Sequence, residues 1–216
     1  MMKKRTFLLV FCALLVLSSA AMGTIAYMTD WAAAINTFSV GDMAIRVDES
    51  AVNPDGTLIE GADRVTGNDY HLLPGATYVK DPKVTMTKGS DSAYVRMLVT
   101  INRIKELNAI FPEGFLPEAH VSGWDATLWP CVGVTDNGDN TATYEFRYHT
   151  AVAAPMDADL SLEPLFTAIT VPGSLTREQM STIADLQITV VGEAVQSSNF
   201  PGETEAWAAF DAQEAN

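Results

Sequence analysis

The chain has 216 residues, of which 13 are Lys or Arg and 27 are Asp or Glu, so its formal net charge at pH 7 is −14. Proteins that bind phosphate backbones or anionic lipid head groups need clustered positive charge, which so acidic a chain does not supply. Composition therefore argues against nucleic acid as a partner, and it limits contact with a membrane to export.

The N-terminus has the pattern of a secretory signal peptide. Residues 3–5 (Lys-Lys-Arg) form a positive n-region, and an uncharged apolar run follows from residue 6 to 22. Small residues satisfy the −3 and −1 positions of a cleavage site in two places, after Ala20 or Ala21 and after Ala26. The pattern predicts export and leaves the cleavage register open.

Two other interpretations of this N-terminus concern the membrane. Residues 6–28 are long enough for a retained anchor, although no stop-transfer charges follow them. A lipoprotein signal requires a Cys at the end of the apolar run, whereas Cys12 lies in its middle. Secretion with removal of the signal is the favoured interpretation.

Removal of the signal leaves one cysteine and a more acidic chain. The mature part keeps 10 basic residues against 27 acidic ones, a net charge of −17. Cys131 then has no partner for an intramolecular disulfide. We expect a small buried residue beside Trp129; an intermolecular bridge or a reactive thiol is the alternative.

Alternating apolar residues and turn motifs predict short strands in the first half of the mature chain. Residues 35–47 fit two short strands or one strand with a bulge. Turns are predicted at 53–56 (Asn-Pro-Asp-Gly), 72–76 (Leu-Leu-Pro-Gly-Ala) and 88–91. The clearest alternation runs from 93 to 102 with apolar residues on both faces, which predicts a central strand.

The second half predicts a hairpin, two further strands and some short helices. Residues 123–134 and 141–152 are expected to pair across the turn at 136–139, leaving one wet face. The further strands are 165–171 and 185–195. The expected helices are 104–111, which Pro112 ends; 174–182, with Thr176 and Gln179 in capping-box spacing; and 203–210.

Strands of this number and spacing predict a mostly β fold with a few short helices. The connections are of Greek-key length, which is typical of an antiparallel β-sandwich of immunoglobulin or jelly-roll type. Such a sandwich has edge strands, which are either protected or used for pairing.

Motifs for catalysis or cofactor binding are missing from the sequence. It contains no His-Glu-x-x-His zinc motif, no Gly-x-Ser-x-Gly elbow and no phosphate-binding loop, so no catalytic residue and no cofactor is predicted. Asp136 and Asp139 are weak candidate Ca²⁺ ligands, but the EF-hand pattern is absent and a polar hairpin turn explains them better.

Several segments carry a family resemblance. Residues 23–30 read GTIAYMTD, and Thr37-Phe38 precede Gly41 by a few positions; further on come LPGATYVKDP (73–82), SAYVRM (92–97) and ITVVGEAVQ (188–196). These segments resemble the end of the signal, the strand motifs and the closing strand of the TasA/camelysin family of exported Gram-positive proteins. Met28 stands where that family usually has Phe, and residues 104–130 match nothing in it.

The resemblance implies a jelly-roll subunit of an extracellular fibre, in the biofilm matrix or on the cell or spore surface. It selects Ala26-Tyr27 as the bond cleaved by a SipW-type signal peptidase. The implied division is a signal peptide (1–26), an N-terminal segment (27–40) and a single sandwich domain (41–216).

The segment 27–40 is the predicted donor strand. Its apolar residues Ile35, Phe38 and Val40 alternate imperfectly, and it would add to the sheet of the next subunit to give a head-to-tail homopolymer. An ordinary first strand of the same domain is the other interpretation.

Two rival functions remain open at this stage. Some members of the family are described as metalloendopeptidases, although this sequence shows no zinc motif. A ligand-binding or adhesive module is the second rival, because Trp124, Trp129, Tyr144 and Tyr148 could form an exposed aromatic platform. A sandwich core accounts for these four rings better.

Overall fold

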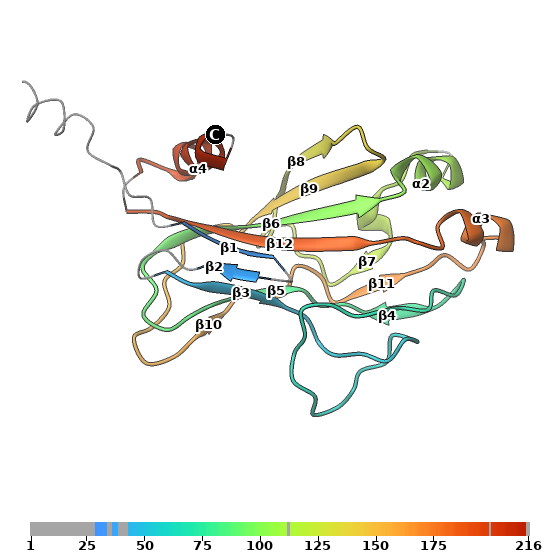
Figure 1. Ribbon diagram of the computed structural model, residues 1–216, viewed down its shortest axis with the longest axis horizontal. Coiled ribbons are helices and arrows are strands. Elements are labelled where there is room, and N and C mark those ends of the chain that lie inside the picture. Colours follow the sequence, from blue (N-terminus) through green and yellow to red (C-terminus); the bar gives the residue numbers. More distant parts are fainter. Residues whose placement is uncertain (1–28, 34–35, 39–42, 112, 199, 215–216) are drawn as a thin grey trace, which may run out of the picture.

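The computed structural model describes residues 29–33, 36–38, 43–111, 113–198 and 200–214. Its largest element is a six-stranded antiparallel sheet of strand order β2-β1-β12-β6-β9-β8 (Figure 1). The strands are β1 (Thr29–Ala33), β2 (Asn36–Phe38), β6 (Ala93–Asn102), β8 (Cys131–Asp136), β9 (Thr141–Arg147) and β12 (Ile188–Gln196).

Two three-stranded antiparallel sheets form the opposite layer. The first has the order β10-β5-β3 and the second β4-β11-β7. Their strands are β3 (Ile45–Asp48), β4 (Thr77–Val79), β5 (Lys83–Met86), β7 (Val121–Ser122), β10 (Leu160–Ser161) and β11 (Ala168–Thr170). The chain passes repeatedly between the large sheet and the small ones, as in a jelly roll, and the predicted mostly β sandwich is confirmed.

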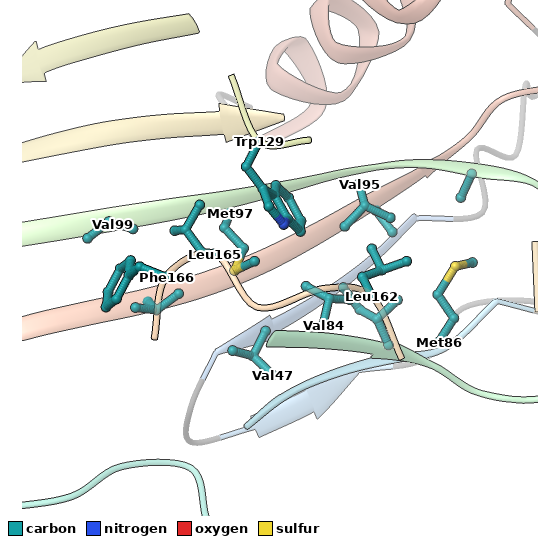
Figure 2. Packing of buried hydrophobic residues seen from close by; sticks show 14 of the residues in the cluster. Val47, Val84, Met86, Val95, Met97, Val99, Trp129, Leu162, Leu165 and Phe166 are labelled. Atoms are coloured by element: carbon teal, nitrogen blue, oxygen red, sulfur yellow. The ribbon is translucent and has the colours of Figure 1, made fainter. Parts of the chain in front are cut away.

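The core lies between these layers. Figure 2 shows Val95, Met97 and Val99 of β6 on one side and, on the other, Val47 of β3 and Val84 of β5. Their burial follows from the alternation of the strands, since every second side chain points to the same face. The prediction that β6 is central is confirmed, because β12 and β9 pair along its two sides.

One glycine sets the spacing of the layers. A Cβ on Gly192 of β12 would lie 2.4 Å from Cγ2 of Val47 and 3.3 Å from Cγ2 of Val84. The large sheet and the strands β3 and β5 therefore approach each other at this point more closely than a side chain at position 192 would allow.

Short helices lie at the margins of the sandwich. They are α2 (Ile104–Ile110), the single 3₁₀ turn η1 (Pro117–Ala119), α3 (Arg177–Thr182) and α4 (Glu203–Glu214). The predicted capping box is confirmed at α3, where Thr176 Oγ1 accepts from the Gln179 backbone N–H and Gln179 Oε1 accepts from that of Thr176. In the described part of the chain no helix is long and apolar enough to cross a membrane.

Three predicted strands are shorter than expected. The second strand of the hairpin, predicted over 141–152, ends at Arg147. Within 165–171 only β11 is a strand. Leu165 and Phe166 enter the core from a loop, and the Leu165 N–H donates to the Pro82 carbonyl instead of to a paired strand. Residues 123–130 fold into turns around Asp125, whose carbonyl accepts the Trp129 N–H, so the hairpin strand begins only at Cys131.

Candidate functional site

The N-terminal strands lie at one edge of the large sheet. β1 pairs antiparallel with β12 in five positions, from Thr29 opposite Val195 to Ala33 opposite Val191. β2 folds back on β1, with Phe38 opposite Trp31, and forms the edge itself. The described part of the predicted donor segment is thus a strand pair that adds to β12 of its own chain.

The other residues predicted for export and strand donation cannot be placed. Ala26 and Tyr27 of the cleavage site lie outside the described residues, as do Ile35 and Val40 of the donor segment. Only Phe38 is described, as the last residue of β2.

β12 pairs with a strand on each of its two sides. One side pairs with β6 in nine positions, while the other meets β1 through the backbone. Val190 and Ala194 anchor β12 in the core, so its backbone position is fixed by packing on one face. A strand held in this way offers a row of main-chain donors and acceptors that any suitable extended segment can satisfy.

The C-terminal helix α4 covers the outer face of the sheet beside this edge (Figure 1). Trp207 and Phe210 of α4 pack with Val195 of β12 and Tyr94 of β6 in a second buried cluster. Since Val195 is also the residue opposite Thr29, α4 supports the strand at the point where β1 joins it.

Arg96 ties α4 to the sheet. Its guanidinium lies 2.6 Å from Glu193 Oε2 and 2.5 Å from Asp211 Oδ1, and it stacks 4.3 Å from the centre of the Trp207 ring. Burial disfavours the cation, but the hydrogen bonds to Asp211 and Glu193 outweigh that effect and raise the pKa of Arg96. One feature of the sequence points to this residue, a charge in the middle of an alternating strand.

The opposite edge of the sheet is β8. All six of its residues are exposed, including Val132 and Val134. A bulge between Cys131 and Gly133 interrupts the ladder to β9 and shields the edge in part.

The candidate calcium ligands are used within their own turn. Asp136 Oδ1 accepts the Gly138 N–H at 2.8 Å, and Asp139 Oδ1 accepts the Thr141 hydroxyl at 2.6 Å. The hydrogen bond from Thr141 also lowers the pKa of Asp139. Within the described ranges no three His, Cys, Asp or Glu side chains are grouped so as to hold a metal ion.

The predicted aromatic platform does not form as a unit. Trp129 is fully buried and donates its Nε1 hydrogen to the Glu163 carbonyl, so the core interpretation is confirmed for this ring. Tyr148 packs edge-on against Trp129, whereas Trp124 and Tyr144 are half-buried in the lining of an apolar pocket. Cys131 lines the same pocket and is exposed, so its predicted burial beside Trp129 is wrong.

Comparisons with protein-family models, with curated proteins and with solved structures find no match to this chain.

Proposed function

We propose that this chain is a secreted fibre subunit of an extracellular matrix or cell surface, with an assembling rather than a catalytic role. In this proposal a SipW-type signal peptidase cleaves Ala26-Tyr27. The freed segment 27–40 then leaves β12 of its own chain and pairs with β12 of the next subunit.

The observation that carries the proposal is the pairing of β1 with β12. The described part of the predicted donor segment lies at a sheet edge, where β1 pairs with β12 in a defined register. A strand at the end of the chain can make the same bonds to a neighbouring copy, and such an exchange adds little new surface and costs little. Because donor and acceptor are different surfaces, an exchange in which each subunit receives from one neighbour and donates to another builds an open filament, whereas a reciprocal exchange would close a dimer.

The sequence supplies the second support. The motifs at residues 23–30, 73–82 and 188–196 resemble the TasA/camelysin family, and the last of them is β12 itself. The acceptor strand of the proposal is thus a segment that carries the resemblance.

The test is to secrete the chain together with a SipW-type peptidase, sequence the mature N-terminus and search for filaments by electron microscopy. Tyr27 at the N-terminus together with filaments is the expected result. A monomer cleaved after Ala21 would contradict the proposal.

A chain that begins at Gly41 provides the matched control. It should stay monomeric, and filaments formed from it would refute strand exchange. A synthetic 27–40 peptide should bind this shortened chain and stabilise it without restoring filaments, because a free peptide cannot link two subunits; a peptide of scrambled order should do neither.

A further inference from the structure

An apolar pocket opens on the side of the sandwich away from α4. It has a volume of about 80 Å³ and lies between the inner face of β6 and β9 and the segment 115–124, with β11 closing it. Rings make up much of its wall: Phe115, His120, Trp124, Tyr144 and Phe146. Val99 and Ile101 of β6 belong to the aliphatic part of the lining.

The rings are held in place by contacts with one another and with Trp129. Trp124 donates its Nε1 hydrogen to the Trp129 carbonyl at 2.8 Å, and Phe146 packs edge-on against the indole with ring centres 5.8 Å apart. His120 stacks on Phe115 with ring centres 5.4 Å apart and planes 5° from parallel. A ligand would therefore meet a lining that needs little reordering, which favours binding.

One carboxylate faces this lining from the rim. Glu118 on η1 is exposed, and after the larger effect of burial its charge raises the pKa of the Tyr144 hydroxyl and of the Cys131 thiol. Burial lowers the pKa of His120, outweighing the opposite effect of Glu118, so a positive charge on this imidazole is disfavoured.

None of the ion pairs formed among the described residues includes the carboxylate of Glu118. The chain as a whole carries a net charge of −14, which attracts cations and repels anions. The pocket thus combines an aromatic wall, a neutral interior and an available negative charge.

We propose that this pocket binds an alkylated ammonium group, with its methyl groups against the rings and its positive charge towards Glu118. Aromatic faces attract organic cations through their quadrupole, and an apolar wall excludes ions that keep their water. An apolar cavity of roughly 150 Å³ encloses benzene. The smaller space here takes part of a trimethylammonium head, and the remainder of the ligand stays in the open mouth.

Binding at this pocket does not depend on fibre assembly. The ligand would contact the half-buried rings that the sandwich core does not enclose. Two sources share the chemistry: a free quaternary amine and the head group of a phosphatidylcholine membrane.

The test titrates the purified chain with choline and follows the binding by saturation-transfer NMR and Trp fluorescence. Choline should bind, and 3,3-dimethyl-1-butanol, which has the same shape without the charge, should bind about tenfold more weakly. Equal binding of the two compounds, or no binding of choline, would overturn the proposal.

Variants locate the site. Glu118→Gln should weaken choline binding about threefold, as expected for an exposed charge, and Tyr144→Leu about tenfold. Glu113→Gln, an exposed acid nearby in the chain but outside the pocket lining, should change nothing. Equal effects of the Glu118 and Glu113 substitutions would show a general field effect and refute the site.

The source is separated by a sedimentation experiment. Phosphatidylcholine vesicles that carry the protein down in a choline-sensitive way identify the lipid head group. Choline binding without vesicle binding identifies the free amine. Circular dichroism of each variant confirms that the sandwich is intact.

Discussion

Replacement of Arg96 by Met tests how the C-terminal helix is held on the sheet. The Arg96 side chain is 6% exposed, and the partners in its ion pairs are Glu193 (13% exposed), Glu145 (23%) and Asp211 (55%). Loss of one member of a buried ion pair costs about 3 to 5 kcal/mol because the other charge stays desolvated.

Only part of that cost applies here. Asp211 is more than half exposed and contributes little. Glu145 keeps Arg147, whose Nε lies 2.7 Å from its Oε1. The cost therefore comes mainly from loss of the ion pair with Glu193 and of the stacking on Trp207. We expect the free energy of unfolding to fall by about 3 kcal/mol.

The assay is urea unfolding of the purified chain, followed by Trp fluorescence and extrapolated linearly to water. A loss of this size should lower Tm by about 6 to 12 °C for a domain of this length. Arg46→Met is the matched control, because Arg46 is 51% exposed in its ion pair with Asp159 and should cost less than about 1 kcal/mol. If the two substitutions cost the same, Arg96 does not anchor the helix.

Two further predictions concern pH and packing. Burial alone would raise the pKa of Asp81, but the hydrogen bonds from Arg64 and from Ser50 lower it. The stability that the ionised Asp81 carboxylate adds is therefore present above the unfolded pKa of 3.8 and is lost as the pH falls below that value. Between pH 6 and pH 3 the wild type should lose more stability in urea than Asp81→Asn, and parallel losses would contradict this assignment. Gly192→Ala should lower the free energy of unfolding by about 1 to 3 kcal/mol, because the added Cβ forces the layers apart. Gly133→Ala should lower it far less, since its Cβ would meet nothing within 4 Å. If calorimetry finds that Gly192→Ala is as stable as the wild type, the layers yield and the reasoning is wrong.

Features set by neighbouring residues could be predicted from the sequence. The alternation from Ala93 to Asn102 gives β6 with the same bounds, since side-chain direction in a strand depends only on position. The capping box of α3 follows from two residues three positions apart. Turns at residues 53–56 and 72–76 form because Gly56 and Gly75 adopt positive φ angles, which glycine tolerates best.

Features that join distant parts of the chain could not be predicted. The motif at the N-terminus indicated a strand but not its partner, because β1 and β12 lie at opposite ends of the sequence and pair through backbone groups that all residues share. The aromatic residues after Phe115 carried no periodic pattern, and their grouping with Tyr144 depends on a loop that crosses the open side of the sandwich.

The sequence by itself determined the acidic charge, the mostly β character and the positions of most strands and turns, because these depend on composition and local periodicity; it also predicts export. Only the tertiary structure decided which strand receives β1, which charge holds α4 and which rings gather around Glu118. Those outcomes depend on the register of pairs far apart in the chain and on burial, which changes the energy of a charge or a ring according to what packs around it.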